Sequence, residues 1–227
     1  MKPSGFLLAV ALLAAAPITC SGASFAALGG ADYAVPVTSI KQARMLGTTL
    51  QQFDFSCGSA ALATLLTYHY GFPITEREVF EEMYVAGDQQ KIRREGFSLL
   101  DMKRFLEARG FHADGFEQPL DKLMEANIPA IVLLVENGYH HFVVVKGIHG
   151  DRVLLGDPAT GTRAIARAQF QAIWKKELLF VIHNRMEQAR FNRAEDWRVA
   201  PSAPLAAGVI QRSLIDSALS KFGPGDF

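Results

Sequence analysis

The first half of the chain carries apolar residues at helical spacing, and four helices are predicted from it. Good helix formers run from residue 57 to Tyr70, where Gly71 and Pro73 end the segment. Thr75 stands three residues before Glu78, a capping-box pattern that predicts a second helix to about residue 86. The remaining two helices are expected over residues 98–108 and 120–126.

The second half carries short β-branched and apolar runs instead, and these predict strands. The runs cover residues 130–135, 141–148, 152–155 and 178–182. Short polar turns separate the first three, as expected of hairpins, so the sheet should be mainly antiparallel. Helices followed by strands are typical of an α+β domain with its helices packed on the sheet, and we assign this domain to residues 48–185.

The N-terminal segment has the pattern of a secretory signal peptide. Lys2 precedes an apolar run over residues 6–18, and small residues follow up to Ala26. Because a membrane span needs about 20 apolar residues, this run is too short for a stable anchor. We therefore predict a signal peptide over residues 1–26, a periplasmic location for the mature chain, and an extended lead-in over residues 27–47.

The C-terminal segment, residues 186–227, is polar at first and contains Pro201 and Pro204, which indicates a linker. An amphipathic tail helix is predicted after it, because apolar residues recur at three- and four-residue steps. The stripe consists of Val209, Ile210, Leu214, Ile215, Ala218, Leu219 and Phe222. Such a helix can dock on the domain or on a partner.

The composition excludes several classes of protein. Hydrophobic residues make up 49% of the 227 residues, which rules out intrinsic disorder. The chain has 23 basic and 23 acidic residues, so its formal net charge is zero and nucleic acid is not an expected partner. No long apolar run follows the signal segment, so no stable membrane span is expected after its removal.

Cysteine usage directs attention to one residue. Cys20 lies in the signal segment, so Cys57 would be the only thiol of the mature chain and could form no internal disulfide. A small buried residue is the simplest role for Cys57. Its place at the start of a predicted helix, however, also favours the thiolate and suits a nucleophile. For Cys20, lipid attachment is the rival role, but residues 17–19 match the usual small-residue box poorly.

Three further residues complete a candidate catalytic set. His141 begins the most apolar strand, and Asp157 ends the next one, so the two can meet at neighbouring strand ends. His140 should face the other side of the sheet. Gln51, six residues before Cys57, could aim an amide N–H at an oxyanion. The other histidines are scattered, and neither a metal nor a cofactor is expected.

These residues resemble the C39 family of cysteine peptidases. In that family a Gln precedes a Cys-Gly pair by six positions, the helix after the Cys ends in Tyr-Gly, and His-Phe-Val-Val-Val precedes an Asp-Pro pair by sixteen residues. Here the matching residues are Gln51, Cys57-Gly58, Tyr70-Gly71, 141–145 and Asp157-Pro158. The resemblance implies a papain-like fold, with Cys57 as nucleophile, His141 as general base and acid, Asp157 as its orienting partner and Gln51 as oxyanion donor.

The chain departs from the C39 pattern in two ways. Ser56 stands where an Asp usually precedes the Cys, and no transporter segments follow the domain. A stand-alone, signal-bearing member is similar to the exported C39-like proteins of bacterial functional-amyloid secretion systems. The resemblance therefore implies an exported cysteine endopeptidase whose partners are a peptide or protein substrate, amyloid subunits and secretion-system components among the candidates.

Two other functions fit the same residues. A C39-like domain with a residual triad would serve as a binding module or chaperone for an exported client. The same triad would also serve an acyltransferase or amidase, because leaving-group and acceptor specificity depend on pockets that the sequence does not reveal.

Overall fold

The structure is a computed structural model that describes residues 23–26, 32–35, 39–136, 138–174 and 177–200. The chain divides into two compact units, Met1–Ser39 and Ile40–Phe227. In the first unit, strands β1 (Ala23–Ala26) and β2 (Asp32–Val35) form an antiparallel pair. Most of the predicted signal segment and the whole predicted tail helix lie outside the described residues.

The second unit is built on a six-stranded sheet. Its strands are β3 (Ala113–Glu117), β4 (Ala130–Glu136), β5 (Tyr139–His149), β6 (Arg152–Asp157), β7 (Gly161–Ala166) and β8 (Leu178–Ile182). Their order in the sheet is β3-β8-β4-β5-β6-β7, and neighbouring strands pair antiparallel throughout. The predicted α+β class with a mainly antiparallel sheet is confirmed.

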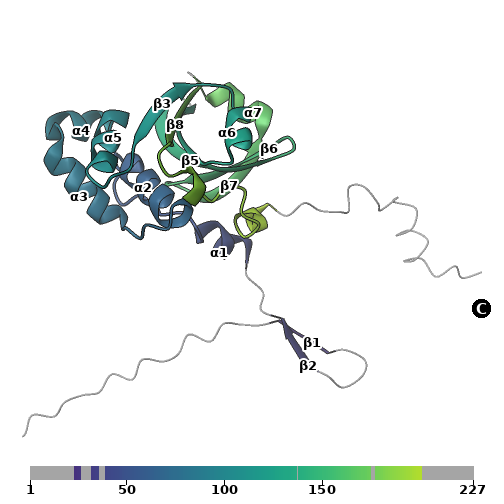
Figure 1. Ribbon diagram of the computed structural model, residues 1–227. Coiled ribbons are helices and arrows are strands. Elements are labelled where there is room, and N and C mark those ends of the chain that lie inside the picture. Colours follow the sequence, from purple (N-terminus) through teal and green to yellow (C-terminus); the bar gives the residue numbers. More distant parts are fainter. Residues whose placement is uncertain (1–22, 27–31, 36–38, 137, 175–176, 201–227) are drawn as a thin grey trace, which may run out of the picture. The chain divides into compact units, whose positions relative to one another are not determined.

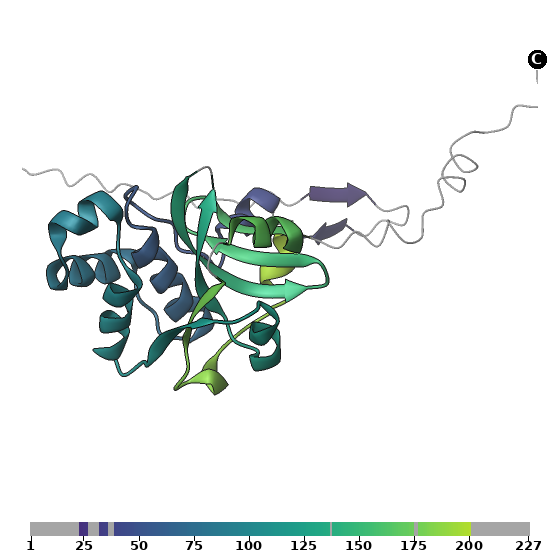
Figure 2. The same cartoon turned by 90° about the horizontal axis from the view of Figure 1, so that it is seen from above.

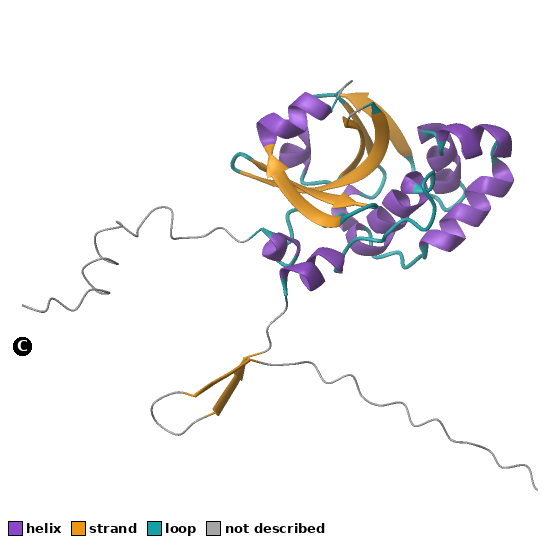
Figure 3. Ribbon diagram, turned by 180° about the vertical axis from the view of Figure 1, so that it is seen from behind, coloured by secondary structure: helices purple, strands orange, loops and turns teal. Residues whose placement is uncertain are grey.

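Helices cover both faces of this sheet (Figures 1 and 3). The helices are α1 (Ile40–Met45), α2 (Cys57–Thr64), α3 (Glu76–Ala86), α4 (Gln89–Glu95), α5 (Leu99–Glu107), α6 (Asp121–Ala126) and α7 (Arg167–Ile173), and α2 continues into a π-helical turn over Leu65–His69. Helices α2 to α5 lie together on one side, as the view from above shows (Figure 2). Helices α6 and α7 pack against the opposite face.

The buried apolar side chains form one cluster on each face of the sheet. Every residue of α2 is buried in or beside the first cluster, which also contains Phe142 and Val144 of β5. Val143 and Val145 belong to the second cluster, with Phe170 of α7. Alternate residues of β5 thus face opposite clusters, because side chains alternate across a strand. This central strand reads as one continuous apolar run because both of its faces are covered.

Capping boxes begin two of the helices. Thr75 Oγ1 accepts a hydrogen bond from the Glu78 backbone N–H at 3.2 Å, and Glu78 Oε2 accepts one from the Thr75 N–H at 2.8 Å. This is the predicted capping box of α3. An equivalent box formed by Ser98 and Asp101 begins α5.

The structure differs from the sequence prediction in several elements. The lead-in predicted to be extended contains α1, whose Ala43 is buried. Strands β3 and β7 and helices α4 and α7 were not predicted, because their segments are short and β3, with the sequence ADGFE, has little β-propensity. The described helices include none that is both long and apolar enough to cross a membrane.

The largest difference concerns residues 186–200, which the sequence predicts to be a linker. This segment, called here the strap, packs along the domain and forms two 3₁₀ turns, Met186–Gln188 and Asp196–Val199. Its Phe191 is buried in the second apolar cluster, and its Asn192 side chain accepts a hydrogen bond from the Ile148 N–H at 2.7 Å. Asp196 forms an ion pair with Lys146 of β5 at 2.7 Å, and Lys146 is fully buried. The strap is therefore part of the folded domain.

Candidate active site

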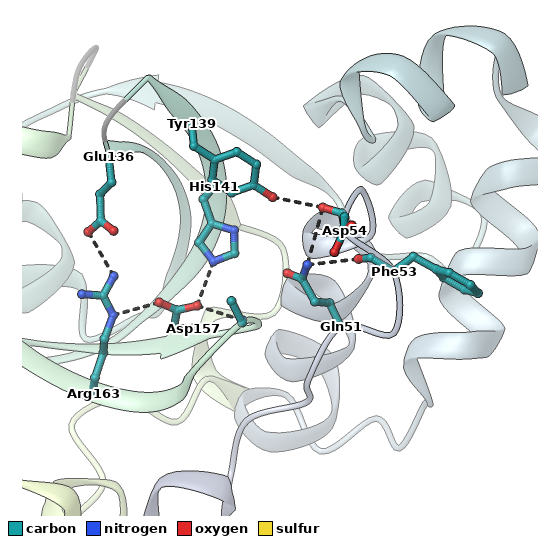
Figure 4. Close-up of polar contacts among 9 residues, drawn as sticks. Gln51, Phe53, Asp54, Glu136, Tyr139, His141, Asp157 and Arg163 are labelled. Carbon is teal, nitrogen blue, oxygen red and sulfur yellow. Dashed lines mark hydrogen bonds and ion pairs between the residues drawn. The ribbon is translucent and has the colours of Figure 1, made fainter.

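The pairing of β5 with β6 brings His141 and Asp157 together. Val144 lies opposite Gly156, so the register places Asp157 opposite Val143 and on the same face as His141. Diagonal neighbours on adjacent antiparallel strands are within reach of long side chains. His141 Nε2 donates a hydrogen bond to Asp157 Oδ1 at 2.8 Å, and both side chains are nearly inaccessible (Figure 4).

The turn after β6 and a neighbouring arginine hold the Asp157 carboxylate. Its Oδ1 also accepts the Ala159 backbone N–H at 2.9 Å, and its Oδ2 accepts Arg163 Nε at 2.8 Å. Arg163 in turn donates Nη2 to Glu136 Oε1 at 3.2 Å. The chain Glu136–Arg163–Asp157–His141 joins four strands (Figure 4), and the sequence gives no local signal for Arg163.

These contacts set the charges of the pair. Burial lowers the pKa of His141, but the hydrogen bond to Asp157 and the nearby Cys57 sulfur raise it, with a net pKa of about 9. Burial raises the pKa of Asp157, but the hydrogen bond to His141, the Ala159 N–H and the Arg163 charge outweigh burial and hold it well below its usual range. At neutral pH the pair is therefore an imidazolium and a carboxylate.

Cys57 is the first residue of α2, and its side chain is buried and not in a disulfide. Its sulfur is close enough to affect the charge of His141, while Nδ1 of that imidazole is buried and has no hydrogen-bond partner. Hydrogen bonds between catalytic groups are often long until substrate binds. With Nε2 turned to Asp157, the nitrogen left for the thiol is Nδ1.

The loop before α2 is held by side chains at both of its ends. Ser56 is at the N-cap of α2, but its side chain does not cap the helix. Its Oγ donates to Phe53 O and accepts from the Phe53 N–H. Gln51 donates Nε2 to Phe53 O at 3.0 Å and approaches Asp54 O at 3.5 Å (Figure 4). Ser56, the residue that departs from the C39 pattern, thus holds the loop that precedes Cys57.

Tyr139 is a site residue that the sequence analysis missed. Its ring stacks on the His141 imidazole, with centroids 5.9 Å apart and an interplanar angle of 28°. Its hydroxyl donates to Asp54 O at 3.0 Å (Figure 4). The signal was its position two residues before His141, because residues i and i+2 of a strand share a face.

His140 faces away from Asp157, as strand alternation predicts. It lines an apolar groove of about 710 Å³ with Phe142, Leu133 and Val135 of the sheet. The start of α5, the end of α7 and the start of β8 complete the groove, through Ser98, Leu99, Leu100, Trp174 and Leu178. In the part of the chain that the structure describes, no cluster of three or more His, Cys, Asp or Glu side chains is arranged to hold a metal ion.

A family model decides the classification, because the peptidase C39 family matches residues 46–186. The chain belongs to the peptidase C39 family. The match ends at the beginning of the strap, so the strap lies almost wholly outside the family's common part.

Similarity to individual members of the family extends beyond residues 46–186. The chain is 37% identical over 220 residues to the probable functional amyloid protease FapD of Pseudomonas fluorescens, covering 95% of each sequence. It is 41% identical over 154 residues to the protein of the same name from Pseudomonas aeruginosa, covering 68% of each. The chain is a cysteine peptidase, and it acts on peptide or protein substrates.

The solved structures agree with this C39 fold. The peptidase domain of Streptococcus ComA, described as a bifunctional ABC transporter of a quorum-sensing pathway, matches with a TM-score of 0.50 and 20% identity. The match covers 60% of this chain and 96% of that domain. At this level of identity the likeness establishes the shared peptidase fold.

Proposed function

We propose that Cys57, His141 and Asp157 are the catalytic triad of an exported endopeptidase that processes a component of a functional-amyloid secretion system, with Gln51 as an oxyanion donor. One observation carries the triad: Asp157 fixes the imidazole through Nε2 at 2.8 Å, and the buried Nδ1, without a hydrogen-bond partner, is left for the nearby thiol. A buried polar atom without a partner is costly in a folded protein, so its presence here favours a functional role.

The first half of the reaction follows from these positions. The thiolate of Cys57 attacks the scissile carbonyl carbon, and the carbonyl oxygen becomes an oxyanion. The backbone N–H at the start of α2 donates a hydrogen bond to that oxyanion. The Gln51 amide donates a second one when its 3.5 Å contact with Asp54 O gives way to substrate. His141, protonated at neutral pH, gives its Nδ1 proton to the leaving amine, the C–N bond breaks, and a thioester on Cys57 remains.

The second half regenerates the enzyme. His141, now neutral, takes a proton from water at Nδ1, and the hydroxide attacks the thioester carbonyl. The C–S bond breaks, the carboxylic acid leaves, and the thiolate is again paired with the imidazolium. Asp157 remains ionised throughout, because its contacts favour the carboxylate.

A labelling experiment tests the activated thiol. The rate at which iodoacetamide alkylates Cys57 is measured at neutral pH in the wild type, in His141→Ala and in His140→Ala. His140 is the matched control, because it is the adjacent histidine but lines the groove on the other face. We expect His141→Ala to label at least tenfold more slowly and His140→Ala to match the wild type. Equal, slow labelling of all three proteins would overturn the triad.

A Cys57→Ala variant separates catalysis from folding. Alanine is a good helix former and removes only a small buried volume, so the melting temperature should fall by a few degrees at most. Peptide cleavage should be abolished. Unfolding of this variant would show that Cys57 has a structural role.

The apolar groove supports a peptide as substrate. It shares strand β5 with the proposed active site, through His140 and Phe142, and its lining is almost entirely apolar, which suits the hydrophobic side chains of a peptide segment. Leu100 is 53% exposed at its edge. Leu100→Arg should therefore raise KM for a protein substrate while kcat stays within about twofold.

The export role is supported by the signal-like N-terminal segment and by the similarity to FapD over 95% of both sequences. Cell fractionation with N-terminal sequencing tests it, and we expect a periplasmic protein that starts near residue 27. Mass spectrometry of amyloid-system components incubated with wild type and with Cys57→Ala identifies the substrate. A product that forms equally with both proteins argues against cleavage by this enzyme.

A further inference from the structure

Tyr139 connects the two halves of the active site. It begins β5, the strand of His141, whereas its hydrogen-bond acceptor, Asp54 O, lies in the loop that precedes Cys57. The two residues are 85 positions apart in the sequence. The bond from Tyr139 to this loop therefore joins the part that carries the imidazole to the part that carries the thiol (Figure 4).

The loop over residues 51–56 is itself held in place, so a hydrogen bond to it fixes the position of the Tyr139 hydroxyl. Gln51 and Ser56 both bind Phe53 O, and the Gln51 backbone N–H donates to Pro158 O at 2.9 Å, next to Asp157. Asp54 lies between these fixed points and is three residues before the nucleophile. A loop held at both ends moves little, so the Tyr139 hydroxyl is tied to a defined position relative to α2.

The ring of Tyr139 constrains the imidazole in a second direction. Asp157 fixes Nε2 in the plane of the His141 ring, whereas the stacked Tyr139 ring limits tilting out of that plane. Stacked aromatic pairs have a preferred geometry that resists such tilting. Together the two contacts leave Nδ1 with little freedom except to face the thiol.

Core packing does not account for Tyr139. The residue is 53% exposed and belongs to neither apolar cluster. A half-exposed tyrosine whose polar end and ring both contact active-site groups has little to contribute to the core. Partial burial raises the pKa of the Tyr139 hydroxyl, and so do the nearby Cys57, Asp54 and Asp157.

We propose that Tyr139 is a positioning residue that sets the orientation of the His141 imidazole and its separation from the Cys57 thiol. The ring sets the orientation, and the hydroxyl bound to Asp54 O sets the separation. This proposal rests on the proposed triad, because it assigns to Tyr139 an effect that is exerted through His141.

Two variants separate the ring from the hydroxyl. Tyr139→Phe keeps the stacked ring and removes the bond to Asp54, while Tyr139→Leu removes both. Tyr84→Phe is the matched control, since it removes a tyrosine hydroxyl that accepts a hydrogen bond from Arg93 Nε and contacts no residue of the proposed triad. For each protein, kcat and KM, the pH profile of Cys57 alkylation and the melting temperature are measured.

We expect Tyr139→Phe to lower kcat about fivefold, equivalent to about 1 kcal/mol, with KM within twofold. Tyr139→Leu should lower kcat about thirtyfold and move the alkaline limb of the alkylation profile to lower pH, because the imidazolium is held less well. Tyr84→Phe should behave as the wild type. The partial rescue by phenylalanine identifies the contribution of the ring.

Two results would overturn the proposal. One is wild-type kcat and an unchanged pH profile in Tyr139→Leu. The other is a change confined to KM in both variants, which would make Tyr139 a substrate contact. The wild-type protein and His141→Ala, alkylated in parallel, test the triad separately, so failure of the triad and failure of the Tyr139 proposal give different results.

Discussion

At the scale of single residues, the charge and orientation of His141 depend on the hydrogen bonds that Asp157 accepts. Asp157 accepts hydrogen bonds from an imidazole, a backbone N–H and a guanidinium, so both of its oxygens are occupied. A carboxylate with several donors stays ionised while buried. In the proposed triad Arg163 therefore acts indirectly, by keeping Asp157 charged and fixed in the plane of the imidazole.

Replacing this carboxylate should affect chemistry more than binding. In Asp157→Asn the charge that raises the pKa of His141 is lost, so this pKa should fall from about 9 toward 6.5. We expect kcat to fall by a factor on the order of 10³, with KM within about threefold. Steady-state kinetics and the NMR titration of the His141 ring measure the two effects.

A second Asp–His pair provides the control for this variant. Asp114 accepts a hydrogen bond from His183 Nε2 at 2.9 Å on the surface of the domain. Asp114→Asn should leave kcat unchanged. A fully active Asp157→Asn enzyme would mean that another group orients His141.

At the scale of the elements, the position of Cys57 depends on how closely α2 approaches α5. A Cβ atom placed on Gly58 would lie 2.9 Å from Met102 Cε and 3.1 Å from Phe97 Cβ. The Met102 methyl group can move, but Phe97 Cβ is attached to the backbone. A side chain at position 58 would therefore force the first turn of α2 and Phe97 apart by a few tenths of an ångström. Cys57 precedes Gly58 in the chain and would move with that turn.

We therefore expect Gly58→Ala to be destabilising, although alanine is the better helix former. Overpacking costs about 1–3 kcal/mol and exceeds the helix-propensity gain of about 1 kcal/mol. Thermal melting should show a loss of a few degrees, and kcat should fall with it. In a double variant, Met102→Leu removes the Cε atom and should recover part of the loss. If the losses of stability in Gly58→Ala and Met102→Leu simply add up in the double variant, the contact with Met102 is not the cause of the strain.

The elements also show which features a single sequence can predict. The four helices and four strands with strong local patterns were predicted, and so was the meeting of His141 with Asp157, because strand register follows from hairpin spacing. Strand β3 was missed because ADGFE is paired with β8 through the tertiary fold rather than by its own propensity. Arg163, Tyr139 and the strap are defined by contacts between distant segments, and local patterns carry no trace of such contacts.

At the scale of the whole molecule, the strap covers Lys146 and supplies its counter-charge, Asp196. This lysine is fully buried, and its ammonium donates to Asp196 Oδ1 and to Gly47 O, each at 2.7 Å. Removing one partner of a buried ion pair costs about 3–5 kcal/mol, because the other charge remains buried. The strap should therefore be required for a stable domain.

Truncations at two points test this requirement. A chain that ends at Ala200 keeps the strap and should melt as the full chain does. A chain that ends at Asn184 loses Phe191 and Asp196 and should be unfolded or far less stable. Asp196→Asn should show most of the same loss, whereas Glu195→Gln, at an exposed neighbouring pair with Arg193, should show almost none. Equal stability of both truncated chains would contradict the role of the strap.

Two histidines should place the stability maximum near pH 6.5. Burial lowers the pKa of His69 to about 4. Between pH 6.5 and 4 this histidine is therefore protonated in the unfolded chain but neutral in the folded chain, so stability falls as the pH drops through this range. His141 has its pKa raised to about 9, so its contribution is complete below 6.5 and is lost as pH rises to 9. Denaturant unfolding across this range measures both slopes. His69→Asn should flatten the acid slope, and His141→Asn the alkaline one.

The strap also determines when the domain can finish folding. A protein chain emerges from the ribosome, or through a membrane pore, with its N-terminus first. Cys57, His141 and Asp157 all emerge before Asp196, yet Lys146 between them has no buried counter-charge until Asp196 arrives. We therefore expect the Cys57 thiol to be present before the domain is fully stable. Peptidase activity should then begin late in synthesis, after the chain has emerged as far as Asp196.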